Sequence, residues 1–164
     1  MLVMSHLDSP LGALLLACRA DGAVVALDFG EFEGRFRARL GEAVEGAAPA
    51  AVARALEGYF AGDVRALEGV LVAPVGREFQ LAVWAELRRI PAGETRSYGE
   101  VARALGAPGA SRAVGLANGR NPVMLVIPCH RVIGADGALT GYAGGVARKA
   151  WLLRHEGVLA ATLV

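Results

Sequence analysis

Cysteines and long apolar runs are both scarce in this chain of 164 residues. The two cysteines, Cys18 and Cys129, are too few for a disulfide framework, which argues against a small secreted scaffold held together by such bonds. The longest apolar runs, such as residues 123–127, are far too short to span a bilayer. The N-terminus, MLVMSHLDSP, lacks the basic head and apolar core of a signal peptide. We therefore expect a cytoplasmic protein with no membrane contact.

Net charge is also small, at +1, but it is unevenly distributed. Residues 1–75 carry 6 basic and 10 acidic side chains, whereas residues 76–164 carry 11 basic and 6 acidic ones. The weak overall charge argues against a histone-like DNA binder, although a basic C-terminal half fits contact with phosphates along one face. The same charge would arise from solvated arginines in a lysine-poor chain, so charge alone leaves both readings open.

Residues 1–75 show the pattern of a small antiparallel sheet with helices. Three apolar segments are typical of strands, and the turn signal Asp8-Ser9-Pro10 indicates that the first two form a hairpin. A first helix is expected after the strands, followed by a Gly-, Ala- and Glu-rich loop, and apolar residues at helical spacing predict a second helix. The predicted strands are 2–7, 11–17 and 23–29, the helices are 31–40 and a segment from about 52 to 60, the loop is 41–49, and the connector to the next part is 64–75.

Residues 76–164 are predicted to form a second, mostly helical domain that contains a helix-turn-helix. An apolar stripe at Phe79, Val83, Leu87 and Ile90 predicts one helix, which Pro91 ends. The fold class is therefore α+β, with an N-terminal α/β domain over 1–75 and a C-terminal domain over 76–164.

The helix-turn-helix is predicted just after Pro91. Ser97 and Glu100 form a capping box that starts a helix, and the glycine-containing turn 106–109 separates it from a second helix over 110–118. The second helix is rich in small residues, which let a backbone approach another surface closely. That surface is either a neighbouring helix or a DNA groove, and the pattern alone does not decide between them.

Cys129 follows the apolar run 123–127, which is predicted to be a buried strand or extended segment. Beyond it, the glycine-rich segment 135–145 is predicted to be a loop and residues 148–155 a final helix, with Gly157 as its C-cap. A thiol attacks as its thiolate, so a reactive cysteine needs a base or a positive field nearby. His130 and Glu156 are candidates for that role, although each taken singly reads as a structural residue.

The motif around Cys129 resembles the active-site signature of the O6-alkylguanine-DNA alkyltransferases. The similarity is collinear over most of the chain, from about residue 79 to 157, and also covers the N-terminal hairpin. The matching segments are Asp8-Ser9-Pro10-Leu11-Gly12, Arg96-Ser97-Tyr98, Ala113-Val114-Gly115, Asn121-Pro122-Val123, Pro128-Cys129-His130-Arg131-Val132, Gly141-Tyr142 and His155-Glu156-Gly157.

The resemblance implies a stand-alone, bacterial-type repair protein without a cofactor. Such a protein flips an O6-alkylguanine out of double-stranded DNA, bound through the minor groove, and transfers the alkyl group irreversibly to its own cysteine. Cys129 matches the acceptor, His130 and Glu156 match the residues that activate it through a water, and Asn121 matches the residue that supports the active-site turn. A monomer is expected, and O4-alkylthymine stays open as a second substrate.

The resemblance also assigns the residues that meet DNA. Tyr98 matches the tyrosine that crowds the target's 3′ phosphate and helps to rotate the nucleotide. Arg112 matches the arginine that fills the vacated space in the stack. Ala113 and Gly115 belong to the small helix face that lets the minor groove come close.

The resemblance assigns the guanine pocket to Tyr98, Val132, Tyr142 and Ala143. At Ala143 the chain departs from the family. Many members have serine where Ala143 stands, so a hydroxyl is missing although the backbone N–H remains. Some members hold zinc near the N-terminus. Cys18 matches one such ligand, but a set of four is absent, so no metal site is predicted and Cys18 is expected in the core.

Three other functions remain open from the residues alone. Relatives that bind alkylated bases without repairing them replace the cysteine, and Cys129 argues against this reading. A helix-turn-helix transcription factor would need a basic recognition helix, and residues 110–118 contain one arginine. A cysteine hydrolase would need an oxyanion hole and repeated turnover.

Overall fold

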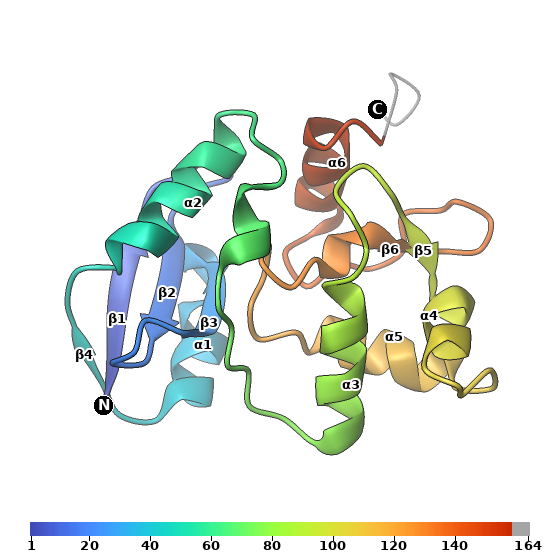
Figure 1. The fold of residues 1–164 in the computed structure, drawn as a ribbon, viewed down its shortest axis with the longest axis horizontal. Helices are drawn as coiled ribbons and strands as arrows, with labels where there is room; N and C mark the ends of the chain where they lie inside the picture. Colours follow the sequence, from blue (N-terminus) through green and yellow to red (C-terminus); the bar gives the residue numbers. More distant parts are fainter. Residues whose placement is uncertain (159–164) are drawn as a thin grey trace. The chain divides into compact units, whose positions relative to one another are not determined.

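The computed structural model describes residues 1–158 and has the predicted α+β fold (Figure 1). The chain forms two compact units. The first comprises Met1–Val75 together with Pro122–Val126, and the second comprises Gly76–Asn121 and the chain from Ile127 onward. The predicted second domain includes residues 122–126, whereas the structure groups them with the first unit. Within the described part of the chain, no helix is both long and apolar enough to cross a membrane.

The first unit is built on a four-stranded sheet in the order β3-β2-β1-β4. Strand β1 (Leu2–Leu7) pairs antiparallel with β2 (Leu14–Cys18), which pairs antiparallel with β3 (Val24–Phe29). The predicted hairpin is confirmed, with its second strand starting at Leu14 instead of residue 11. A fourth strand, β4 (Ala43–Glu45), lies in the predicted loop and pairs parallel with β1, so the sheet is mixed.

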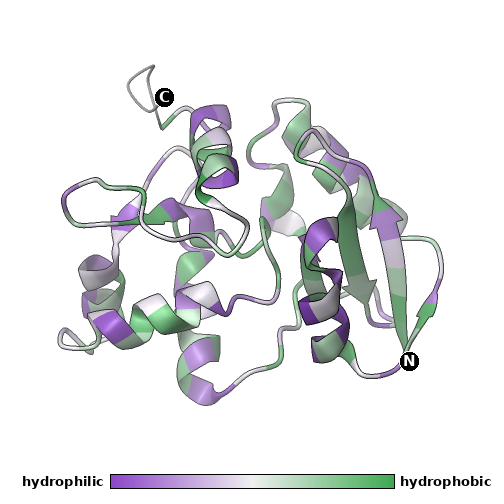
Figure 2. Cartoon of the chain, turned by 180° about the vertical axis from the view of Figure 1, so that it is seen from behind, coloured by the Kyte–Doolittle hydropathy of each residue, from purple (hydrophilic) through white to green (hydrophobic). Residues whose placement is uncertain are grey.

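Helices α1 (Glu33–Leu40) and α2 (Ala50–Phe60) complete the first unit, with short 3₁₀ turns at Gly30–Phe32 and Ala66–Gly69. The sheet strands are mostly hydrophobic, whereas α1 mixes polar and apolar residues (Figure 2). Apolar side chains from β1, β2, β3 and α1 meet in one core cluster, whose members are Met4, Leu15, Ala17, Ala26 and Phe36. Cys18 is 1% exposed, which confirms its prediction as a core residue.

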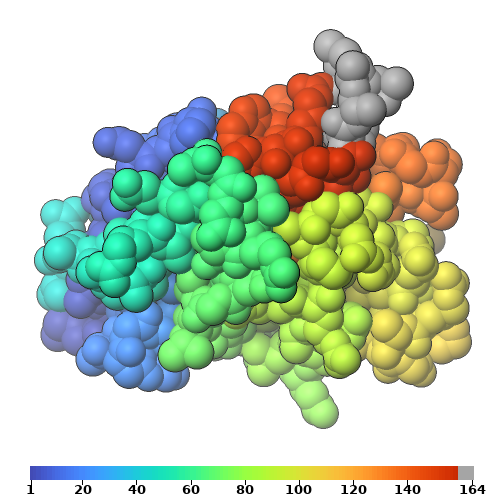
Figure 3. All heavy atoms as spheres, turned by 45° about the horizontal axis from the view of Figure 1, so that its top comes forward, coloured from blue at the N-terminus to red at the C-terminus, as the bar shows by residue number. Residues whose placement is uncertain are grey.

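The second unit contains four helices among the described residues: α3 (Glu78–Leu87), α4 (Tyr98–Ala104), α5 (Ser111–Gly119) and α6 (Val146–His155). A 3₁₀ turn at Cys129–Arg131 leads into β6 (Val132–Ile133), which pairs parallel with β5 (Arg96–Ser97). The loop before α6 lies at the surface, as the orange region of Figure 3 shows.

Helices α4 and α5 form the predicted helix-turn-helix. The Ser97 Oγ accepts the Glu100 N–H at 3.1 Å, and the Ser97 N–H donates to the Glu100 carboxylate at 2.9 Å, so the capping box is confirmed. Helix α3 supports α5, because the Trp84 indole N–H donates to the Ala117 carbonyl at 2.9 Å. The apolar stripe of α3 is buried at Val83 and Leu87, whereas Phe79 is 37% exposed. The helix ends at Leu87, before the predicted stop at Pro91, so the buried Ile90 lies beyond it.

The run over residues 123–127 is buried as predicted but is not a strand. Val123 forms an isolated bridge with Leu27, and the chain then turns through Leu125, whose φ is +70°. The Leu27 N–H donates to the Pro122 carbonyl and the Met124 N–H donates to the Leu27 carbonyl, both at 2.9 Å. A left-handed leucine is unfavourable for an L residue, so packing and not local preference sets this turn.

Candidate active site

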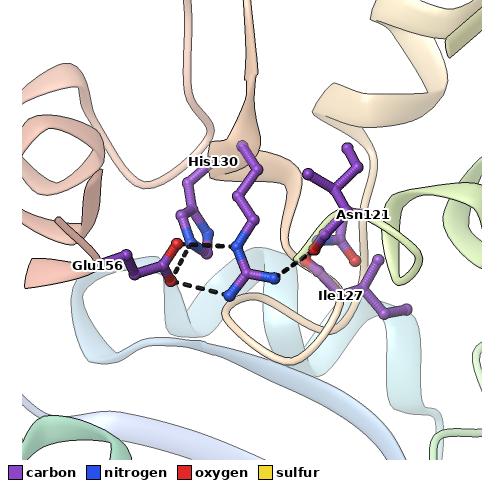
Figure 4. Close-up of polar contacts among 6 residues, drawn as sticks. Asn121, Ile127, His130 and Glu156 are labelled. Atoms are coloured by element: carbon purple, nitrogen blue, oxygen red, sulfur yellow. Dashed lines mark hydrogen bonds and ion pairs between the residues drawn. The ribbon is translucent and has the colours of Figure 1, made fainter. Parts of the chain in front are cut away.

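Cys129 opens the 3₁₀ turn Cys129–Arg131 and is 1% exposed. Its N–H donates to the Ile127 carbonyl at 2.8 Å, and the Asn121 side chain donates to the same carbonyl at 2.7 Å. The hydrogen bond between Asn121 and Ile127 thus holds together the two ends of the segment 122–126 (Figure 4). Asn118 from α5 adds a longer bond, 3.4 Å from its Nδ2 to the Cys129 carbonyl. The side chains of two buried asparagines therefore fix the backbone that carries the thiol.

His130 lies beside Cys129 and is fully buried. Its Nε2 is 2.8 Å from Glu156 Oε2, and since a carboxylate only accepts, Nε2 carries the proton (Figure 4). Burial lowers the pKa of His130, outweighing the carboxylate that raises it, so the imidazole is neutral at rest. The lone pair is then on Nδ1, which is buried and has no hydrogen-bond partner among the described residues. His130 is poised to accept one proton at Nδ1.

Glu156 also binds Arg131, at 2.8 Å from Nε to Oε1 and 3.0 Å from the guanidinium to Oε2. The remaining guanidinium nitrogen donates to the Ile90 carbonyl at 2.7 Å. Burial raises the pKa of Glu156, but hydrogen bonds from His130 and Arg131 outweigh it and hold that pKa well below its usual range. The carboxylate therefore stays ionised and keeps the imidazole oriented.

The end of α6 places Glu156 at this point. The Gly157 N–H donates to the Arg154 carbonyl and the Val158 N–H donates to the Leu153 carbonyl, both at 2.9 Å. This is the Schellman pattern, and Gly157 adopts the φ of +84° that it requires. The prediction of Gly157 as the glycine that ends the helix is confirmed.

Lys149 is the single lysine of the chain, beside 16 arginines, and it is 0% exposed. Its ammonium group donates to the Val132 carbonyl at 2.6 Å and to the Thr140 carbonyl at 3.0 Å. Burial lowers the pKa of Lys149 to about 8, although a charged Cys129 acts to raise it. The attraction is mutual, so the Lys149 charge favours the thiolate of Cys129. Sequence reasoning missed this residue.

The residues predicted to meet DNA lie on the helix-turn-helix. Arg112 and Ala113 are exposed near the start of α5. Leu116, one turn after Arg112, is 60% exposed and was not predicted. Gly115 faces the Tyr98 ring, since a Cβ built there would lie 3.6 Å from the ring. This exposed face of α5 has small, apolar and cationic side chains.

The predicted pocket residues are brought together only in part. The Tyr142 ring stands edge-on to the His130 ring, with centroids 6.5 Å apart. Val132 is fully buried, and its carbonyl is held by Lys149. Ala143 follows Tyr142 in the loop and is half-buried. Among residues 1–158, no three His, Cys, Asp or Glu side chains group as a metal site would require.

Comparison with known proteins gives consistent matches. The family model described as "6-O-methylguanine DNA methyltransferase, DNA binding domain" matches residues 78–158. The methylated-DNA–protein-cysteine methyltransferase of Salmonella typhimurium is 43% identical over 96% of this chain and 97% of its own length. The protein of the same name from Mycobacterium leprae is 47% identical over 92% of this chain and 89% of its own.

Solved structures agree with the sequence relatives. The crystal structure of Mycobacterium tuberculosis O6-methylguanine methyltransferase matches with a TM-score of 0.82 and 42% identity, covering 99% of this chain and 98% of that one. A structure of the M. tuberculosis OGT protein in complex with DNA matches with a TM-score of 0.82 and 42% identity, covering 97% and 96%.

Proposed function

Since the chain belongs to the family of methylated-DNA–protein-cysteine methyltransferases, we propose that it transfers an alkyl group from O6 of guanine in DNA to its own Cys129. The observation that carries this proposal is the buried row of groups beside the thiol. Cys129 adjoins a neutral His130 whose Nε2–H is fixed by Glu156 and whose Nδ1 is open. This arrangement suits a thiol that must lose its proton at the moment of attack.

The transfer proceeds as a displacement at the alkyl carbon. A bridging water carries the thiol proton to His130 Nδ1, and Glu156 and Lys149 stabilise the resulting imidazolium and thiolate. The sulfur bonds to the alkyl carbon while the carbon–O6 bond breaks, and its electron pair goes to O6. The freed guanine takes up the proton that the thiol lost. The product is a thioether, a poor leaving group, so each chain reacts once.

Access to O6 requires the base to leave the duplex, which costs a few kcal/mol. We place this task on the exposed face of α5 and on Tyr98. Arg112 enters the stack, Tyr98 crowds the phosphate, and Ala113 and Gly115 let the minor groove approach. The solved M. tuberculosis relative in complex with DNA supports DNA as the partner. The flipped guanine sits between Tyr142, Ala143 and the Val132 backbone, and one chain acts alone.

The test is intact mass after incubation with a duplex that contains O6-methylguanine. Excess substrate should add one methyl group per chain, and peptide mapping should place it on Cys129. Cys129→Ala should give no adduct while still binding DNA. Repeated turnover would indicate a hydrolase, binding without an adduct would indicate a recognition protein, and a label on Cys18 would refute the assignment of the acceptor.

A further inference from the structure

Tyr98 is held from two sides. Its ring lies against Gly115 of α5, where a Cβ would stand 3.6–3.7 Å from two ring carbons. Its hydroxyl is 3.0 Å from Thr140 Oγ1, in the loop that precedes α6. The ring therefore contacts the helix assigned to DNA while the hydroxyl contacts the loop assigned to the pocket.

The backbone of Thr140 is itself fixed. Its N–H donates to the Ala138 carbonyl at 3.0 Å, and its carbonyl accepts the Lys149 ammonium at 3.0 Å. The same ammonium holds the Val132 carbonyl, three residues after Cys129. Thr140 is thus anchored to the framework of the nucleophile, although its own side chain lies at the surface. An anchored hydroxyl can fix the position of the hydroxyl of the half-buried Tyr98, which it contacts.

We propose that Thr140 is a positioning residue that holds Tyr98 in the orientation needed to rotate the target nucleotide. This inference rests on the proposed function. The Thr140 hydroxyl contacts neither the Cys129 thiol nor His130, which accepts the thiol proton, so it acts only through Tyr98. It ties the side chain that turns the nucleotide to the loop that receives the flipped base, so both keep one geometry. Nucleotide rotation then depends on a bond that the transfer chemistry does not use.

The test compares transfer from a methylated duplex with transfer from the free base O6-methylguanine, which needs no rotation. Thr140→Val keeps the shape and removes the hydroxyl, whereas Thr140→Ser keeps the hydroxyl. Loss of one exposed hydrogen bond should slow duplex transfer about two- to tenfold. Transfer from the free base, which enters the pocket also assigned to Tyr98 but needs no rotation, should fall less than transfer from the duplex, and Thr140→Ser should keep the wild-type rate on both. Thr95→Val makes the same chemical change at a threonine that is not the partner of Tyr98, and it should match wild type.

A double-mutant cycle separates positioning from a structural role. In a Tyr98→Phe background the hydroxyl partner is already gone, so adding Thr140→Val should cause no further loss on the duplex. Equal loss on both substrates, or a full effect of Thr140→Val in Tyr98→Phe, would overturn the proposal. A wild-type chain that gains no methyl group would refute the proposed function, whereas normal wild-type transfer with an unaffected Thr140→Val would refute only this inference.

Discussion

Glu156→Gln removes one charge from the middle of the buried cluster and keeps the side chain's shape. The wild-type carboxylate accepts from His130 and twice from Arg131, at 2.8–3.0 Å. A glutamine has one acceptor oxygen, so the guanidinium of Arg131, a residue 7% exposed, would keep its bond to Ile90 but only part of its pairing with residue 156. Breaking a buried pair from one side costs about 3–5 kcal/mol of unfolding free energy. Domains of this size have an unfolding free energy of about 5–15 kcal/mol, so the variant should still fold but with reduced stability.

The rate should fall as well. A glutamine oxygen can still accept from Nε2–H, but it cannot stabilise the imidazolium that forms during transfer. We expect the rate of alkyl transfer to fall about 10- to 100-fold, which is part of the 10²–10⁴-fold rate acceleration that a general base contributes. The loss should be similar for duplex and free-base substrates, because the defect lies in the proton transfer and not in rotation of the nucleotide.

Urea unfolding followed by tryptophan fluorescence measures the first effect, since Trp84 is buried at 3% exposure. Glu68→Gln is the matched control. It makes the same change in an exposed ion pair with Arg65, and such pairs contribute less than about 1 kcal/mol. Arg131→Met added to Glu156→Gln should recover part of the loss, because it removes the stranded cation. Equal urea midpoints for Glu156→Gln and Glu68→Gln would refute the reasoning.

Three further changes test other parts of the site. Between pH 8 and 10.5 only the unfolded chain keeps the Lys149 proton, so the unfolding free energy from urea titrations should rise with pH in this window, and the rise should vanish in Lys149→Met. An equal change in unfolding free energy between pH 7 and 9.5 in the wild type and in Lys149→Met would contradict this. Arg112→Ala should slow transfer from the duplex much more than transfer from the free base, as measured in quenched time courses. Equal losses on both substrates would show that Arg112 acts in the transfer chemistry or in folding, and not in base flipping. Ala143→Ser should change the ratio of methyl to benzyl transfer rates, with a difference in activation free energy of about 1–3 kcal/mol. An unchanged ratio would show that this position does not determine which alkyl group is accepted.

Local signals account for what the sequence predicted correctly. The capping box at Ser97 and Glu100 lies within four residues, and the apolar spacing of Val83 and Leu87 lies within one helical turn. The glycine after α6 is likewise a local signal, because a helix commonly ends on a left-handed residue. Such features can be predicted from a short window of sequence without knowing the fold.

The features that escaped prediction depend on distant partners. Strand β4 is short and forms only because β1 offers a parallel edge. The left-handed Leu125 has no sequence signal, since leucine disfavours that conformation. The roles of Arg131 and Lys149 arise from partners 25 and 17 residues away. A signal for Lys149 was nevertheless present, because every other basic side chain except the histidines is arginine.

The division of the chain also has a consequence for the order of folding. Pro122–Val126 belongs to the first unit, although almost fifty residues of the second unit separate it from Val75. During synthesis the N-terminal sheet can form early, but the Leu27 N–H and carbonyl find their partners only after Pro122 and Met124 have emerged. The first unit is therefore completed by residues 122–126, which come directly before the segment that contains Cys129. A ribosome-bound chain that ends before residue 122 has neither a finished first unit nor a reactive thiol at position 129, so the two arrive together.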